Sequence, residues 1–287
     1  MKDIFALQDE IVQRIVANLR IQVLEAELER VRRIATDNLT AYDSFLRGGA
    51  YFLRFTKETN AQARQMYERA IALDPMYAEA YGFLAWTYLR EWQFLWNQEP
   101  QVLKRSFELG QKALALKDSL SIPHMLLGHV YLWQKQPEQA IAQAERVISL
   151  DPNDDVGYWT LAFILNYAGR AKEAVGLMEK AMRLSPHDSG LYLWELGRGY
   201  FLTERYEEAI AALKRSLDRN PDFSPAHINL AVIYSELSRE EEARVETAEV
   251  LRIDPNFSLE VWRQRLPYKD PAITERLVIA LRKAGLK

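Results

Sequence analysis

The chain has 287 residues, with 37 basic and 40 acidic side chains, a net charge of −3 and 48% hydrophobic residues. Charges of both signs are interspersed without a long basic stretch. This argues against nucleic acid as the main partner, because phosphate binding needs a basic stripe. The absence of cysteine excludes disulfides, thiolate metal sites and a cysteine nucleophile. No apolar run approaches the roughly 20 residues that span a bilayer, and Met1 leads into an amphipathic pattern rather than a signal peptide. We therefore expect no membrane partner and a cytoplasmic location.

Residues 1–38 are expected to form an N-terminal amphipathic helix that ends at Thr36-Asp37-Asn38. Its apolar residues recur at three or four positions, the period of a helix with one apolar stripe. Two interpretations fit the stripe: a capping helix packed on the first repeat, or a self-association seam between two copies of the chain. The residues proposed for such a seam are Ile4, Ile11, Ile15 and Leu19.

Two irregular helical repeats are expected next, over residues 39–75 and 78–118. The second closes late, at Asp118, because residues 91–100 form an insertion that carries Trp92, Phe94 and Trp96. Aromatic side chains in such a loop either fold back onto the repeats or contact a partner or a second subunit. The sequence leaves both interpretations open.

Four regular repeats follow, over residues 121–154, 155–188, 190–223 and 224–257. Their closing prolines are 34, 35 and 34 residues apart, at Pro152, Pro186, Pro221 and Pro255. Apolar residues within each repeat keep the helical period, with a polar turn in the middle, so each repeat predicts two helices. Two helices of this length cannot bury their apolar faces alone, so the repeats must stack. The pattern predicts an all-α solenoid.

Residues 258–287 are expected to form C-terminal capping helices. A short helix through Trp262 ends before Pro267, and Asp270-Pro271 has the residue types of an N-cap followed by a first-turn proline. The last helix would cover the apolar end of the solenoid, as stacked repeats require.

The repeat resembles that of the tetratricopeptide repeat (TPR) family. The shared features are the period, leucine-small pairs such as Leu127-Gly128, alanines such as Ala140, and the closing prolines. The tryptophan that is usual near the start of the first helix in this family is missing, and His124, Tyr158, Leu193 and His227 stand there. The resemblance implies a right-handed superhelix of about six helix-turn-helix repeats over residues 39–257, whose first helices line a concave surface.

The concave surface that the resemblance implies is rich in aromatic residues. Such a surface with a few polar points suits an amphipathic helix or an extended apolar peptide. The alternative is that these rings pack between adjacent first helices. The residues expected to bind a protein or peptide partner are Trp86, Met125, His129, Trp133, Trp159, Phe163, Tyr167, Trp194, Arg198 and Phe201.

The sequence contains no pattern typical of a catalytic or cofactor site. Gly48-Gly49 lacks the following Lys-Ser/Thr of a phosphate-binding loop. His124 and His129 are five residues apart, which does not place them on one helical face, and no third metal ligand is near them. We therefore expect no metal, no cofactor and no enzyme activity in this chain.

Three stretches, residues 3–11, 51–57 and 266–271, are similar to the C-terminal TPR region of bacterial class III adenylate/guanylate cyclase proteins. In those proteins a catalytic domain comes before the repeats. Nothing in this chain matches that domain, so no catalytic residue is carried over. The sequence predicts a non-catalytic protein–protein interaction scaffold, the regulatory or sensing arm of a cyclase-type signalling protein. The alternative is a self-associating structural protein that assembles through the N-terminal helix or the loop at 91–100.

Overall fold

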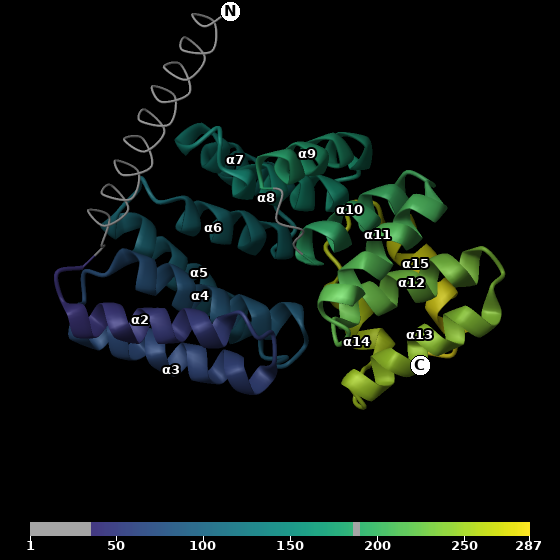
Figure 1. Cartoon of the computed structure of the whole chain (residues 1–287), viewed down its shortest axis with the longest axis horizontal. Helices are drawn as coiled ribbons and strands as arrows, with labels where there is room; N and C mark the ends of the chain where they lie inside the picture. The colour runs from purple at the N-terminus through teal and green to yellow at the C-terminus, as the bar shows by residue number, and fades with distance from the viewer. Residues whose placement is uncertain (1–35, 186–189) are drawn as a thin grey trace, which may run out of the picture. The chain divides into compact units, whose positions relative to one another are not determined.

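The computed structural model describes residues 36–185 and 190–287, and every regular element in these ranges is an α-helix (Figure 1). The expected all-α class is therefore confirmed. The expected N-terminal helix, with Ile4, Ile11, Ile15 and Leu19, lies outside the described residues. The chain divides into two compact units between Ala80 and Tyr81, within helix α4 (Ala78–Gln93).

The described part of the first unit is built on a hairpin of α2 (Leu39–Phe52) and α3 (Lys57–Leu73). Asn38 begins α2, because its side-chain oxygen accepts hydrogen bonds from the amides of Thr40 and Ala41, both at 3.1 Å. The two helices approach closely at Gly48, where an added Cβ would lie 2.6 Å from the ring of Tyr67. That ring fills the space that the missing side chain leaves.

The second unit is a stack of helical hairpins. The pairs α6·α7, α8·α9, α10·α11 and α12·α13 pack tightly, and α6, α8, α10 and α12 also contact one another in that order. We call α4, α6, α8, α10 and α12 the inner helices. The helices after α4 are α5 (Pro100–Leu116), α6 (Ser121–Trp133), α7 (Pro137–Leu150), α8 (Asp155–Tyr167), α9 (Ala171–Leu184), α10 (Gly190–Leu202), α11 (Tyr206–Arg219), α12 (Ser224–Glu236), α13 (Glu240–Ile253), α14 (Leu259–Arg265) and α15 (Pro271–Lys283).

The same turn joins the two helices of each regular repeat. One residue adopts a positive φ of about 60–80° in every turn, at Lys135, Gly169, Glu204 and Ser238. The following amide then donates a hydrogen bond to the carbonyl five residues earlier, as Gln136 does to Tyr131 at 2.9 Å. This geometry satisfies a carbonyl that the end of the first helix would otherwise leave free. Three of the four positions are not glycine, so the turn conformation is fixed by the stacked helices more than by the residue type.

A histidine near the start of α6 and another near the start of α12 each contact a neighbouring helix and the preceding loop. His227 has Nδ1 2.6 Å from Glu246 Oε2 and Nε2 2.9 Å from the carbonyl oxygen of Pro221. His124 makes the same pair of contacts, with Gln143 at 2.7 Å and the Asp118 carbonyl at 3.0 Å. His124 and His227 therefore hold neighbouring helices together at the position where the family usually has tryptophan. These contacts explain why histidine at that position is compatible with stacking of the repeats.

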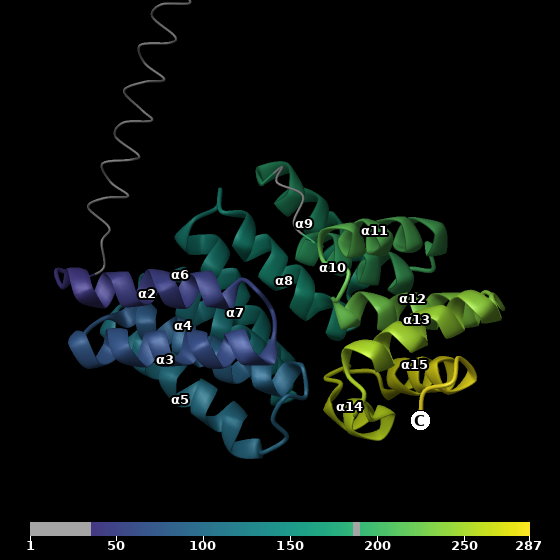
Figure 2. The same ribbon diagram turned by 60° about the horizontal axis from the view of Figure 1, so that its bottom comes forward.

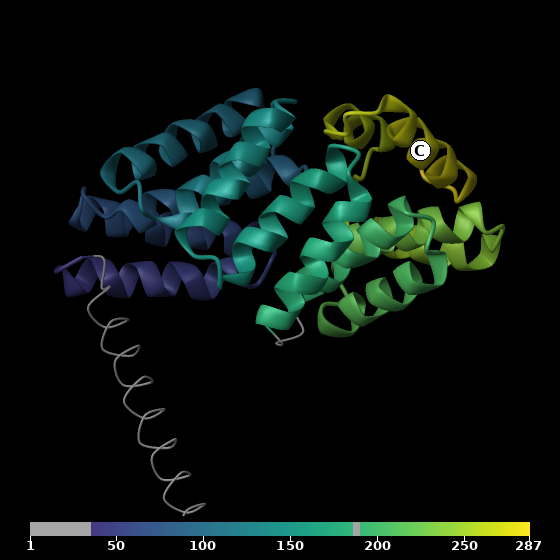
Figure 3. The same cartoon turned by 90° about the horizontal axis from the view of Figure 1, so that it is seen from above.

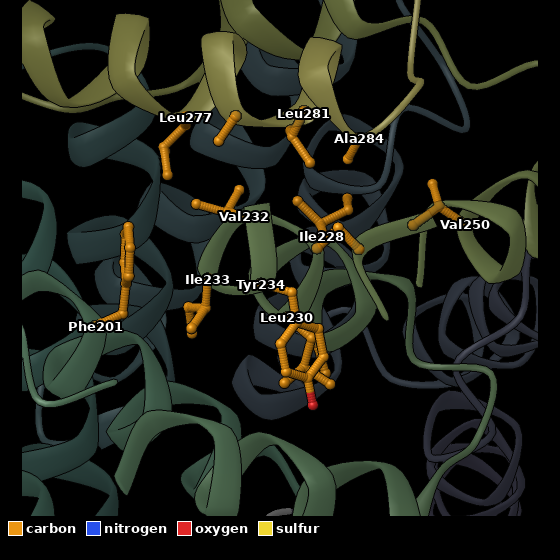
Figure 4. Packing of buried hydrophobic residues seen from close by; sticks show 14 of the residues in the cluster. Phe201, Ile228, Leu230, Val232, Ile233, Tyr234, Val250, Leu277, Leu281 and Ala284 are labelled. Atoms are coloured by element: carbon orange, nitrogen blue, oxygen red, sulfur yellow. The ribbon is translucent and has the colours of Figure 1, made fainter. Parts of the chain in front are cut away.

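Helix α15 packs on α12 and ends the stack (Figure 2). Leu277, Leu281 and Ala284 face Ile228 and Val232 in one buried cluster (Figure 4). Arg276 adds a polar contact, because its guanidinium donates to both carboxylate oxygens of Glu236 at 2.6 Å. The C-terminal helix thus buries apolar surface that the last repeat presents.

Within the described ranges, no helix combines the length and apolar character needed to cross a membrane.

Candidate functional site

The ten residues expected to bind a partner all lie on the inner helices, where contact with the rest of the chain covers most of them. Six are buried: Trp86, His129, Phe163, Tyr167, Arg198 and Phe201. Four are half-buried: Met125, Trp133, Trp159 and Trp194. Phe201 belongs instead to the buried cluster that includes Leu277 of α15 (Figure 4). The Arg276 guanidinium sits 4.8 Å from the Phe201 ring centre.

The remaining aromatic side chains form a continuous row of ring contacts that runs from α4 to Phe223, the residue before α12. Trp86 meets His129 with ring centres 5.0 Å apart, and His129 meets Phe163 at 4.3 Å. The row continues at separations of 5–6 Å, typical of favourable aromatic pairs, through Phe163–Tyr167 at 5.2 Å, Phe163–Trp194 at 6.2 Å and Trp194–Phe223 at 5.4 Å. Trp133 joins the row at Tyr167, with ring centres 6.1 Å apart, and Trp159 joins it at His129, at 5.5 Å. We call this row the inner aromatic face.

A buried ion pair lies at the centre of this face. Arg198 Nη2 donates to Glu195 Oε2 at 2.5 Å, and Asn166 Nδ2 donates to the other oxygen, Oε1, at 2.6 Å. The Arg198 guanidinium also stacks on three rings, with its Cζ 4.0 Å from the centre of Tyr167, 4.6 Å from Phe163 and 5.0 Å from Trp194. A cation surrounded by ring faces is electrostatically favourable. Burial acts to lower the pKa of Arg198, but Glu195 outweighs it and the pKa is raised, so the guanidinium stays protonated.

His129 is a buried neutral side chain on the same face. Burial, with a smaller contribution from Arg198, lowers its pKa to about 3. Neither of its ring nitrogens has a hydrogen-bond partner in the described structure. The same is true of four indole nitrogens, those of Trp86, Trp133, Trp159 and Trp194, and of Nε and Nη1 of Arg198. Unpaired buried donors of this kind are few in folded proteins and each needs a physical explanation. Here they gather on one face.

Two segments distant in sequence from α8 and α10 close over this face. Tyr268, in the connection between α14 and α15, has its ring centre 4.6 Å from that of Tyr167. Phe94, in the loop between α4 and α5, contacts Phe223 at 6.5 Å and stacks on Trp96 at 5.3 Å. Figure 3 shows the C-terminal helices returning toward that loop. The inner aromatic face is therefore in contact with the chain's own loops.

The sequence did not single out Glu195 or Tyr268. Glu195 is completely buried, and the available signal was a pair of opposite charges three residues apart within an otherwise apolar helix. Tyr268 gave no signal of its own, because only the tertiary fold brings it to Tyr167.

The residues proposed for self-association fall into two groups. Ile4, Ile11, Ile15 and Leu19 lie outside the described residues. Trp92, Phe94 and Trp96 are half-buried. Trp92 contacts the Arg265 guanidinium and Phe94 contacts Phe223, both within this chain. Self-association through either segment stays a prediction.

Nothing in the described residues resembles a metal centre, since no cluster of three or more His, Asp or Glu side chains could hold an ion. The candidate site consists of aromatic rings, one buried cation and unpaired donors.

Comparison with known proteins fits this architecture. Models of the tetratricopeptide repeat match residues 123–154, 156–222 and 200–265. The chain is a tetratricopeptide repeat protein. Solved TPR structures support the fold: a thermophilic TPR protein of Thermus thermophilus aligns over 67% of this chain and 98% of its own, at 18% identity and a TM-score of 0.55. A human IFIT1 dimer with m7Gppp-AAAA aligns over 83% of this chain and 57% of its own, at 19% identity and a TM-score of 0.63.

Two curated relatives are similar to this TPR protein over part of their own length. "Putative adenylate cyclase 3" of Rhizobium meliloti (strain 1021) is 35% identical over 141 residues, which is 49% of this chain and 24% of that protein. The human "Protein O-mannosyl-transferase TMTC3" is 25% identical over 228 residues, 78% of this chain and 23% of that protein. The chain thus spans about a quarter of the length of these relatives. The TPR array itself has the fold of a protein-interaction scaffold.

Proposed function

We propose that this TPR protein is a non-catalytic scaffold that binds a peptide segment of a partner on the inner aromatic face. The supporting observation is that unpaired donors and ring faces occur together there, around Arg198. The half-buried rings of Trp133, Trp159 and Trp194 would pack on side chains of the peptide. This is the chemistry of peptide recognition rather than of bond cleavage.

We further propose that the scaffold serves a cyclase-type signalling protein as its regulatory or sensing arm. The support is the 35% identity to the Rhizobium meliloti relative over half of this chain. Because the matched region is only a quarter of that relative, the proposal concerns the repeat array and assigns no catalytic step to it.

Peptide selection tests the binding proposal even though the partner is unidentified. A phage-displayed library of random peptides would be selected on the immobilised full chain, and the affinity of the selected peptides measured by fluorescence anisotropy. Trp133→Ala should weaken binding at least about tenfold, because a tryptophan hot spot at an interface typically contributes about 2 kcal/mol or more.

Tyr131→Ala is the matched control. Tyr131 and Trp133 are half-buried aromatic residues of the same helix, α6, but Tyr131 contacts Phe107 of α5, with ring centres 5.7 Å apart. Its replacement should leave affinity unchanged. The proposal is wrong if no peptide is selected, or if Trp133→Ala and Trp159→Ala bind the selected peptides as tightly as the wild type does.

A further inference from the structure

The segment that joins α14 to α15 lies across the inner aromatic face in the manner of a bound peptide. The backbone amide of Lys269 donates to the carbonyl oxygen of Tyr167 at 2.9 Å. Tyr167 is the last residue of α8, and carbonyl groups at a helix end have no partner within the helix. The segment therefore binds through a main-chain hydrogen bond that carries no side-chain requirement.

Side chains of this segment add three contacts of different kinds. Leu266 is buried in the cluster beneath α15. Tyr268 packs on Tyr167; burial raises the pKa of its hydroxyl, and the nearby Arg198 cation opposes that rise. Lys269 Nζ lies 3.4 Å from Glu138 Oε1, although both side chains are largely exposed, so that ion pair contributes little. Pro267 keeps Leu266 extended, with φ −61° and ψ 125°.

Arg265 joins the start of this segment to the end of α4 and to the loop that follows it. Its Nη1 donates to the carbonyl oxygens of Trp92 at 2.9 Å and Asn97 at 3.3 Å. Its guanidinium also stacks on the Trp92 ring, with Cζ 3.8 Å from the ring centre. No carboxylate of the described residues pairs with Arg265, and burial lowers its pKa. Arg265 therefore contacts only neutral groups among the described residues. Its hydrogen bonds are weaker than those between the two charged side chains of the Glu195–Arg198 pair.

We propose that residues 265–269 are a displaceable internal occupant of the inner aromatic face, and that the partner segment is an extended peptide of the same chemistry. The preferred sequence is an apolar residue, proline, tyrosine and a basic residue in that order. Its tyrosine stacks on Tyr167, its next amide donates to the Tyr167 carbonyl, and its basic side chain faces Glu138. This inference rests on the proposed function and names the class of ligand for the same surface.

A peptide in trans tests this directly on the full chain. A fluorescent ten-residue peptide with the sequence of residues 262–271 would be titrated against the wild type and against Tyr268→Ala and Arg265→Ala chains. A tethered segment competes at an effective concentration of about millimolar, so the wild type should bind the peptide only weakly. Each variant should bind it at least about tenfold more tightly, because its own segment is held less well. A peptide with alanine in place of tyrosine should not bind.

Arg263→Ala is the matched control, since Arg263 is also an α14 arginine but pairs with the exposed Glu275. Its chain should bind the peptide as the wild type does. Hydrogen exchange supplies a second readout: the amide of Lys269 should exchange faster in Arg265→Ala than in the wild type, while α8 and α10 stay protected. Equal peptide affinity in wild type and both variants, or unchanged exchange at Lys269, overturns the inference.

The peptide experiments distinguish a failure of this inference from a failure of the proposed function. If the variants bind the 262–271 peptide no better, but selected library peptides still depend on Trp133, then the surface binds peptides of another class. If library peptides also bind without regard to Trp133, the proposed function fails as well.

Discussion

Replacement of Glu195 by glutamine should be severely destabilising, although the side chain keeps its shape. The change removes one charge of a pair whose N–O distance is 2.5 Å and whose side chains are 0% (Glu195) and 3% (Arg198) exposed. Asn166 could still donate to the new amide oxygen, so the hydrogen bond at Oε1 survives. What is lost is the charge that compensates Arg198 within the rings of the inner aromatic face.

The magnitude follows from the burial of both partners. Two unit charges about 4 Å apart attract by roughly 4 kcal/mol at an effective dielectric constant of about 20. Measurements on buried pairs in other proteins give a loss of about 3–5 kcal/mol when one partner is removed, because the other charge stays buried and unpaired. We expect Glu195→Gln to cost about 3–5 kcal/mol in the free energy of unfolding. The apolar double variant Glu195→Leu with Arg198→Met should recover most of that loss, because it leaves no unpaired charge.

Urea unfolding followed by circular dichroism at 222 nm measures this free energy. Urea is preferable to guanidinium chloride, which is a salt and screens charge. The midpoint should fall at an unchanged slope m, which indicates a change in stability rather than in the unfolded state. A loss below about 1 kcal/mol in the free energy of unfolding for Glu195→Gln would contradict the prediction, because ion pairs on a solvated surface contribute that little. A double variant as unstable as the sum of the single variants would also contradict the reasoning.

Further predictions concern single positions elsewhere in the stack. The pKa of His227 is raised in the fold, because hydrogen bonds to Glu246 and to the Pro221 carbonyl outweigh the opposing effect of burial. Its contribution to stability is therefore present below the unfolded pKa of about 6.5 and is lost as pH rises through the folded value. Glu246→Gln, which reproduces the His124–Gln143 pair, should lower the melting temperature more at pH 5.5 than at pH 8.5; an equal loss at both contradicts this. Gly169→Ala should cost about 1–2 kcal/mol in urea unfolding, because its φ of +81° lies in the left-handed region. Gly176→Ala, at an exposed position within α9 with no atom near the new Cβ, should instead stabilise by about 0.5–1 kcal/mol; the same sign for both would refute the backbone explanation.

The repeat architecture could be predicted because its signal is local and periodic. The spacing of Pro152, Pro186, Pro221 and Pro255 and the apolar period between them are properties of short windows, and stacking is the way such hairpins bury their faces. The candidate surface could be predicted only as a set of positions. Trp133, Trp159 and Trp194 were expected on the inner helices and lie there, but their use in binding a partner stays a prediction.

The sequence by itself determined the helices and the turns between them, because these depend on residues within one repeat. Only the tertiary structure decided what covers the inner helices. Arg265 meets the carbonyl of Trp92 across 173 positions in the chain, and Tyr268 meets Tyr167 across the stack. Such contacts depend on small rotations between repeats that add up along the array. No local sequence pattern encodes the summed rotation of the repeats. The contacts that cover the inner aromatic face could therefore be seen only in the tertiary structure.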